Sequence, residues 1–424
     1  MKRVLSFALV LYASASTVAA QSITIEQAID EAVQHNLSLL AARSSLTIAD
    51  AQMITARLRP NPVASFSADH LDLLGTGFNA ENNAGPIEIA GRVDLPIERA
   101  GKRDARIALA AAMKTEAEAQ FADAVRTLRQ DVTLAWVDVA AAQATRALVA
   151  DTLRTYEDLS RVNRARVTAG SIAPFEATRS EVAMLQFRAT AVRADLDLAT
   201  ATAKLRVLLG RPPGDPLQLA ETLAAFRSAS TDRAADDDAE RIEALAMRSR
   251  PDLRALQFAQ ARTVADLRLQ QALGHVDYVV GAEVRRQQGI AGQGNSLGFF
   301  FSTPLPLLNR NQGEIARAGA EGQQAERQIA ARRAQISADV RGALHEYVTT
   351  RDLVASIERD LLSPATHARD TAAYTYKAGG ATLLELLDAQ RAFNDTMQTY
   401  VDSQSSLRRA IARLNAAVGT EVIR

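Results

Sequence analysis

The chain has 424 residues, with 49 Lys and Arg against 49 Asp and Glu, no cysteine, and 5% aromatic residues. The balanced charge gives no basic footprint for nucleic acid, and the lack of cysteine excludes a disulfide-stapled scaffold and a lipid on an N-terminal cysteine. Alanine, the strongest helix former, is abundant, so the composition predicts a mostly helical body.

The first twenty residues have the pattern of a secretory signal peptide. Lys2 and Arg3 precede an apolar run, Val4–Val10, and small residues lead up to Ala20. We expect cleavage after Ala20 and export across the inner membrane. Past Ala20 no stretch approaches the roughly 18 apolar residues of a membrane helix, so the sequence predicts no helical anchor.

The next segment predicts a helix followed by two strands. Apolar residues at three- and four-residue spacings predict a helix over Thr24–Arg59, which the Pro60–Pro62 turn ends. Alternation predicts a strand over Val63–Leu74, a polar loop over Gly75–Gly85, and a second strand from Pro86 to Ile97. In that second strand one side carries Ile87, Ile89, Val93 and Leu95, and the other carries Glu88, Arg92 and Asp94.

A long helical hairpin follows the strands. The pattern is helical from Glu98 to Thr168, where roughly 70 residues would span about 100 Å. Ala169–Ser171 breaks this helix, and a second helix is predicted over Pro174–Leu209, stopped by Gly210 and two prolines. The first helix has a coiled-coil seam with three- and four-residue steps, formed by Phe121, Val125, Leu128, Val132, Ala135 and Val139.

The pattern then repeats after a polar linker, 214–238, whose acidic run Asp236–Asp238 lacks the spacing of a calcium loop. The two hairpin turns and the two hairpin ends keep one offset, which indicates an internal duplication. We therefore divide the mature chain into 21–213, with a β-hairpin at 62–97 and a helical hairpin at 98–210, and 239–424, with corresponding hairpins at 276–306 and 310–418. The second set of predicted elements is a helix over Glu240–Leu273, a strand over Val276–Gln287, a loop over Gln288–Asn295, a strand over Ser296–Pro306, a helix over Gly313–Lys377, a turn at Ala378–Gly380 and a helix over Ala381–Val418.

Four strands are too few for a membrane barrel, which needs about eight, and open strand edges do not occur in lipid. The sheet is therefore either soluble or shared by several chains. Helices of about 100 Å with narrow seams must pack on neighbours along their length, which favours a tube built from several copies.

These residues resemble the outer-membrane efflux proteins, the TolC-like outer-membrane factors. The similarity lies in LRPNP at Leu58–Pro62, AGKRDARIA at Ala100–Ala108, LLGRPPGDP at Leu208–Pro216 and YKAGGATLLELLDAQRA at Tyr376–Ala392. The resemblance implies a homotrimer in the outer membrane, with a twelve-stranded barrel on a periplasmic α-helical tunnel. The partners it implies are membrane lipid, a periplasmic adaptor and an inner-membrane resistance-nodulation-division pump.

The segment Pro96–Arg103 is similar to the heavy-metal branch of that family, which handles cobalt, zinc and cadmium or copper and silver. The expected function is therefore a passive exit duct for metal cations. Two alternatives remain open: a duct for multidrug efflux or type I protein secretion, and a soluble periplasmic coiled-coil scaffold or adaptor.

The resemblance also implies where the duct is gated. Glu385 and Asp388 match acidic residues that ring the family's periplasmic mouth, Glu176 takes the corresponding place after the first turn, and Tyr376 matches a latching tyrosine. Ala381 stands where the family has an arginine, so the latch here must differ and use a residue such as Lys377 or Arg179. The alternative is that Glu385 and Asp388 are ordinary solvated helix charges.

The hairpin turns are the expected adaptor contacts, since glycine there allows close backbone approach. The residues concerned are Arg166, Ala169, Gly170, Ser171, Lys377, Gly379 and Gly380.

We expect no resident metal, no cofactor and no enzymatic activity. None of the five histidines has a second histidine four residues away, and the sequence contains no P-loop, nucleophile elbow or dinucleotide fingerprint.

Overall fold

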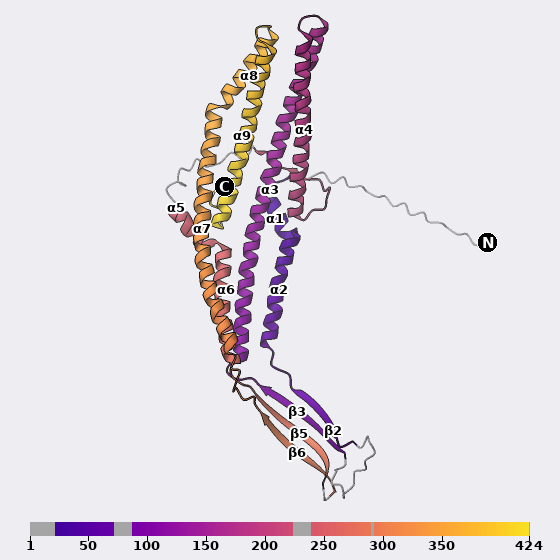
Figure 1. Ribbon diagram of the computed structural model, residues 1–424, viewed down its shortest axis with the longest axis vertical. Helices are drawn as coiled ribbons and strands as arrows, with labels where there is room; N and C mark the ends of the chain where they lie inside the picture. Colours follow the sequence, from indigo (N-terminus) through magenta and orange to yellow (C-terminus); the bar gives the residue numbers. More distant parts are fainter. Residues whose placement is uncertain (1–21, 72–86, 224–238, 290–291, 424) are drawn as a thin grey trace, which may run out of the picture.

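The computed structural model describes residues 22–71, 87–223, 239–289 and 292–423. The predicted signal peptide, the loop at 75–85 and most of the predicted linker lie outside these residues. Figure 1 shows a rod, with a small sheet at one end and two helical hairpins whose turns lie at the other end.

Helices dominate the rod, so the prediction of a mostly helical protein with a β part is confirmed. The elements in chain order are β1 (Ser22–Ile23), α1 (Ile25–His35), α2 (Leu37–Arg57), β2 (Val63–Asp69), β3 (Glu88–Ile97), α3 (Lys102–Thr168), α4 (Pro174–Leu209), β4 (Gln218–Leu219), α5 (Ala239–Ser249), α6 (Pro251–Leu273), β5 (Tyr278–Gly289), β6 (Gly292–Ser302), α7 (Gln312–Asp360), α8 (Leu362–Lys377) and α9 (Leu383–Val418).

Three helices predicted as continuous are each divided in two. The prediction over Thr24–Arg59 was wrong at Asn36, the one over Glu240–Leu273 at Arg250, and the one over Gly313–Lys377 at Leu361. Asn36 has extended backbone and caps α2 by accepting a hydrogen bond from the N–H of Leu39 at 2.9 Å. Arg250 has extended backbone because Pro251 follows it and begins α6.

The first two breaks each dock onto the end of the last helix in the same half. Asn36 Nδ2 donates to the carbonyl of Leu208 at 2.9 Å, and Arg250 donates to the carbonyl of Ala417 at 3.2 Å. Arg250 also interacts with the buried carboxylate of Asp252. Burial alone would raise the pKa of Asp252, but the hydrogen bonds and the positive charge of Arg250 outweigh this effect and lower the pKa overall. The breaks thus tie the sheet-side helices α2 and α6 to the tip-side hairpins.

The strands form one antiparallel sheet in the order β2-β3-β5-β6, together with a two-residue parallel pair of β1 and β4. The second β-hairpin has a shorter connection than predicted, because β5 continues to Gly289 and β6 already begins at Gly292, inside the predicted loop. β6 ends at Ser302 rather than Pro306, since proline lacks the N–H that a ladder requires. Within the described residues, β2 ends at Asp69 rather than Leu74.

The sheet has one apolar face and one polar face. Residues directly opposite each other share a face, and the register places Val93 beside Ala282 and Ala282 beside Phe299. The side chains on this apolar face are exposed, with Phe299 81% and Phe66 85% accessible. An apolar face of this kind within one chain indicates contact with a membrane or another protein.

Arginine–carboxylate pairs lie on the opposite face. Arg285 is paired with Glu88 at 2.6 Å and with Glu283 at 3.0 Å, while Arg92 is paired with Asp94 at 2.8 Å. Phe300 is an apolar side chain on this polar face, and its ring lies under the Arg92 guanidinium, with the guanidinium carbon 4.0 Å from the ring centre.

The AGKR segment joins the two halves at the base of the sheet. Gly101 has a left-handed backbone, and the next residue, Lys102, is buried with its Nζ 2.8 Å from Asp277. The N–H of Arg99 donates to the same carboxylate at 3.0 Å. Asp277 immediately precedes β5, so this contact links the start of α3 to the strand of the other half.

Three apolar cores lie along the rod. One joins α1, α2, α3 and the end of α4, a second joins α5, α6, α7 and α9, and a third lies near the hairpin turns. No helix in the described ranges has the length and apolar character to cross a membrane.

Candidate functional site

Both hairpin turns lie at the tip of the rod (Figure 1), and they have the same local geometry. Gly170 and Gly379 have left-handed backbone, with φ of 69° and 80°. The following N–H groups close the turns, from Ser171 to the carbonyl of Arg166 at 2.8 Å and from Gly380 to that of Thr375 at 2.9 Å. The predicted contact residues at these turns are exposed, except Arg166, which is half-buried: Ala169, Gly170, Ser171, Lys377, Gly379 and Gly380.

Tyr376 joins the two hairpins. Its side chain is buried, and its hydroxyl donates a hydrogen bond to Oδ1 of Asn163 on α3 at 2.7 Å. The guanidinium carbon of Arg166 lies 5.2 Å from the centre of the Tyr376 ring. Neither Lys377 nor Arg179, the partners suggested by the sequence, takes part in this contact. We call the Tyr376–Asn163 hydrogen bond the tip contact.

Ala381 is part of the apolar cluster beside the tip contact. It packs, half-buried, with a core that includes Tyr156 and Met184. Tyr156 stacks on Phe187 with ring centres 4.5 Å apart. Burial raises the pKa of Tyr156; the charge of Arg391 lowers it, whereas Asp388 and Asp395 raise it. Ala381, where the resemblance implies an arginine in the family, thus packs in an apolar cluster.

A group of buried polar side chains, which the sequence analysis did not predict as part of the site, extends from the tip contact toward the sheet. The hydroxyl of Thr152 and the side-chain amide of Gln390 both donate hydrogen bonds to Oδ1 of Asn394, each at 3.1 Å. All three are buried, as is Ser160. The signal was present in the sequence, because Thr152, Tyr156, Ser160 and Asn163 continue the three- and four-residue steps of the α3 seam with polar groups.

Among the residues that the structure describes, several atoms of this buried polar group have no hydrogen-bond partner. They are Asn163 Nδ2, Asn394 Nδ2 and Ser160 Oγ. Burying a polar atom without a partner costs free energy, on the order of 1–3 kcal/mol each. The hairpins are thus joined near the tip by an interface of lower stability than an apolar seam.

Glu385 and Asp388 are both exposed on the first turns of α9. Glu385 belongs to a capping box: its carboxylate accepts from the N–H of Thr382 at 2.7 Å and from the Thr382 hydroxyl at 2.9 Å. These hydrogen bonds lower the pKa of Glu385 below its ordinary value of 4.5. Their stabilising effect is present above that value and is lost as the pH falls through the lowered pKa.

Glu176 lies half-buried in the first turn of α4, where its N–H donates to the carbonyl of Ala173 at 3.0 Å. A carboxylate at a helix N-terminus is stabilised by the helix dipole. The structure thus gives Glu176 and Glu385 a local role at helix starts, and it orients Glu385 and Asp388 outward from the packed core.

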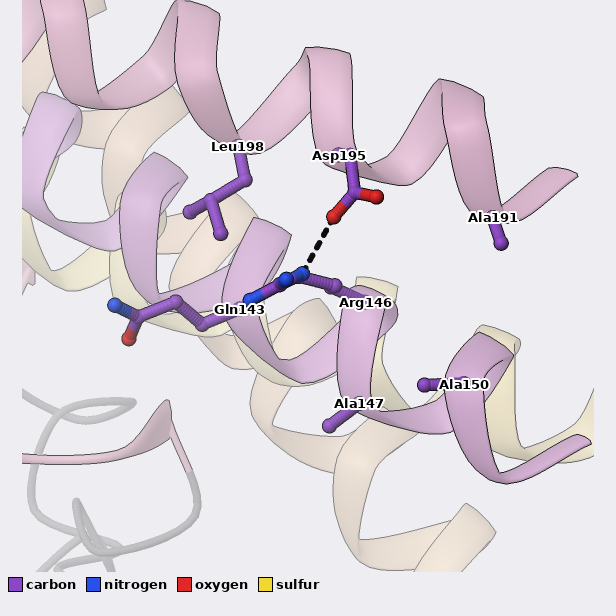
Figure 2. Close-up of a pocket in the computed structure, with 7 residues that line it drawn as sticks. All are labelled: Gln143, Arg146, Ala147, Ala150, Ala191, Asp195 and Leu198. Carbon is purple, nitrogen blue, oxygen red and sulfur yellow. Dashed lines mark hydrogen bonds and ion pairs between the residues drawn. The ribbon is translucent and has the colours of Figure 1, made fainter. Parts of the chain in front are cut away.

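A shallow cavity of about 420 Å³ lies in the groove between α3 and α4, away from the tips. Figure 2 shows its alanine-rich floor and the pair of Arg146 and Asp195, whose atoms are 2.6 Å apart. This cavity offers no set of groups for catalysis. In the described part of the chain, no cluster of three or more His, Asp or Glu side chains is arranged to hold a metal ion.

Comparisons with known proteins agree on the family and the fold. A family model described as outer membrane efflux protein matches residues 28–211 and 244–420. The cobalt-zinc-cadmium resistance protein CzcC of Cupriavidus metallidurans is 24% identical over 95% of this chain and 91% of its own.

Two solved structures have the same fold along nearly the whole chain. The structure of CusC has a TM-score of 0.74 and 18% identity, covering 93% of this chain and 92% of that one. The open state of the Neisseria gonorrhoeae MtrE outer membrane channel has a TM-score of 0.75 and 19% identity, covering 94% and 90%.

Proposed function

Because the chain belongs to the outer membrane efflux protein family, we propose that it is the outer-membrane exit channel of a tripartite efflux system. The observation that carries this proposal is the sheet, whose exposed face is apolar and whose opposite face holds arginine–carboxylate pairs. A barrel wall in lipid requires this division, with apolar side chains outward and polar side chains toward a water-filled lumen.

The proposal includes three copies in the assembly. One chain supplies a four-stranded sheet, and three chains would supply twelve strands, enough to close a barrel in the membrane. The hairpins would then extend from the membrane as a tunnel. A helix of 67 residues such as α3 is roughly 100 Å long, about three times the hydrocarbon thickness of a bilayer.

The proposed mouth of the tunnel lies at the tips. Glu385 and Asp388 would form rings of carboxylates that attract cations, because exposed carboxylates are charged at neutral pH. The tip contact would hold the mouth closed, and the exposed turns would receive the helical hairpins of a periplasmic adaptor attached to an inner-membrane pump.

Heavy-metal cations are the cargo that we propose. Support comes from the likeness to CzcC, named for cobalt-zinc-cadmium resistance, and from the carboxylates at the mouth. A duct of this kind binds its cargo only weakly, because tight binding would slow passage.

The test is a strain that lacks this gene, complemented with the wild type or with the E385Q/D388N double variant. We expect deletion to increase sensitivity to Co²⁺, Zn²⁺ and Cd²⁺ several-fold, with unchanged sensitivity to a panel of drugs. The double variant, present in equal amounts, restores metal resistance only in part. Increased sensitivity to drugs alone would contradict the choice of cargo, and recovery in the soluble periplasm would contradict the channel.

A further inference from the structure

The base of the sheet carries an arginine on its apolar face. The guanidinium carbon of Arg99 lies 4.1 Å from the centre of the Tyr278 ring, and the guanidinium also donates a hydrogen bond to the Tyr278 hydroxyl. Tyr278 lies opposite Ile97 in the ladder, and its ring centre is 5.1 Å from that of Phe301. The arginine is therefore at the end of the apolar rows. We call Arg99, Tyr278 and Phe301 the basal cluster.

The carboxylates near the basal cluster are already paired with other cations. Asp277 pairs with Lys102 at 2.8 Å, and Glu98 pairs with Arg106 through both carboxylate oxygens. Among the described residues, no carboxylate is paired with the Arg99 guanidinium, and its bond to Tyr278 uses only Nη1. The exposed edge formed by Nε and Nη2 is thus available to an anion from outside the chain.

The base of the sheet is basic as a whole. With histidine counted as neutral, the segments that meet there, 57–60, 96–106, 274–278 and 303–311, hold seven Lys and Arg against three Asp and Glu. The guanidinium groups of Arg103 and Arg310 donate to the backbone carbonyls of Arg57 and Pro306, at 2.9 and 3.0 Å. These bonds leave the positive charge of both arginines uncompensated, and such an excess attracts an anionic membrane surface.

A second arginine lies at the other end of the same face. The register places Arg286 beside Ile89, on the apolar side of the sheet. Arg286 and Tyr278 are eight residues apart, roughly 26 Å along β5, or about 20 Å of height at the tilt of a barrel strand. Long arginine side chains at the two ends can reach both edges of an apolar band about 25 Å tall. Because the helices start at the base (Figure 1), the basal cluster would face the periplasmic leaflet.

A phospholipid fits the basal cluster in both of its parts. A guanidinium can bind a phosphate through two parallel hydrogen bonds, and tyrosine is enriched where a membrane meets water. The adjacent row of the apolar face, Leu95, Val280 and Phe301, is 37–62% exposed and provides a surface for an acyl chain. A neighbouring copy would join at the sheet edges, whereas β3 and β5 are the inner strands, so it would not cover this place.

We propose that the basal cluster binds the phosphate of an anionic phospholipid in the periplasmic leaflet, with Arg99 as the phosphate ligand and Tyr278 as the residue that orients it. This proposal rests on the proposed outer-membrane channel and names the lipid class that the channel selects. The excess of positive charge around the cluster favours a headgroup of net negative charge, such as phosphatidylglycerol, over a zwitterionic headgroup.

Native mass spectrometry of the detergent-solubilised particle tests this preference, with phosphatidylglycerol or phosphatidylcholine of identical acyl chains as the probe. We expect phosphatidylglycerol to bind about five-fold more tightly, and Arg99→Gln to reduce the difference to less than about two-fold. The matched control is Arg286→Gln, the same change on the same face at the other end of β5, which should keep the preference. Equal affinity for the two lipids in the wild type would overturn the proposal.

Loss of the preference in R286Q but not in R99Q would also overturn it, because the anionic lipid would then lie at the outer end of the sheet. Tyr278→Phe separates the orienting role from the charge. It keeps Arg99 but removes the hydroxyl that accepts its hydrogen bond, so we expect an intermediate preference, and a preference equal to that of the wild type would reject the role of Tyr278.

A photoreactive phosphatidylglycerol with its reactive group on the headgroup locates the site without any variant, so this measurement stands even if R99Q does not fold. The wild-type protein is placed in phosphatidylethanolamine vesicles that contain the photoreactive lipid as a minor component. Labelled peptides should come from 96–103 or 277–278. Labelling centred on 283–289 would place the lipid at the outer end and contradict the proposal.

The mass and the location of the particle separate this proposal from the proposed function. Three chains from the outer-membrane fraction that bind the two lipids equally would leave the channel standing and reject only the lipid site. Recovery of a single chain from the soluble periplasm would reject both.

Discussion

At the scale of single residues, the tip contact is a buried polar contact, which suits the gate that we propose. Tyr376 and Asn163 are both buried, and the amide nitrogen of Asn163 finds no hydrogen-bond partner in the described ranges. An apolar contact of the same area would hold the hairpins more firmly, because it would leave no polar atom unsatisfied. The contact is thus specific in geometry but modest in stability, as the proposed opening of the mouth would require.

We predict that Tyr376→Phe shifts the channel toward its open state. The substitution removes the donor and leaves Asn163 Oδ1 buried without a partner, a cost of about 1–3 kcal/mol, or roughly 5- to 150-fold in the closed–open equilibrium. Single-channel recording in planar bilayers measures the open fraction. Tyr374→Phe is the control, because Tyr374 is 77% exposed; equal effects of the two variants would contradict the gating role.

At the scale of elements, the helix breaks at Asn36 and Arg250 lie close against the glycines that end α4 and α9. Gly210, which ends α4, has a φ of 73°, and a Cβ there would lie 2.3 Å from the carbonyl oxygen of His35. Gly170 at the tip has a similar φ of 69°, but a Cβ there would meet nothing within 4 Å. One glycine therefore serves both backbone conformation and packing, and the other serves conformation alone.

We predict that Gly210→Ala destabilises the protein more than Gly170→Ala. A left-handed backbone costs a residue with a Cβ about 1–2 kcal/mol at either position. At Gly210 the α1–α2 junction must also move away from α4, which adds to the loss. Thermal unfolding of the detergent-solubilised protein should give a lower midpoint for G210A than for G170A, and equal midpoints would count against this packing role.

At the scale of the whole molecule, a single chain leaves apolar surface exposed in two places, on one face of the sheet and on the side of α4 that carries Phe175, Val192 and Val207. A protein that remained a soluble monomer would cover such surfaces. In the proposed assembly, lipid covers the first and the neighbouring copy covers the second. The exposed apolar side of the long helices then needs no covering helix from the same chain.

We predict opposite outcomes for arginine on the two faces of β6. Phe299→Arg places a charge on the face proposed to meet lipid, at a cost of about 2–4 kcal/mol near the middle of the bilayer. Ser296→Arg places the same charge on the polar face and should be tolerated. The amount of each variant recovered in the outer-membrane fraction measures this, and similar recovery of both would argue against a lipid-facing apolar side.

The sequence by itself determined the helical character, the alternation in the strands and the positions of the two hairpin turns. These features are local, since period, proline and glycine act within a few residues. The bounds of α4 show this, because Pro174 begins the helix and Gly210 follows its end, as the pattern predicts.

Only the tertiary structure decided the docking of Asn36 on the end of α4, the partner of Tyr376, and the pairing of β3 with β5, whereas the break at Leu361 has a local signal in Pro364, in the first turn of α8. The first three features depend on residues far apart in the chain, as in the hydrogen bond between Tyr376 and Asn163 across 213 positions. A periodic apolar pattern tells which face of a helix is buried but not which helix covers it. The identity of the covering helix depends on packing and long-range hydrogen bonds, which a local pattern does not contain.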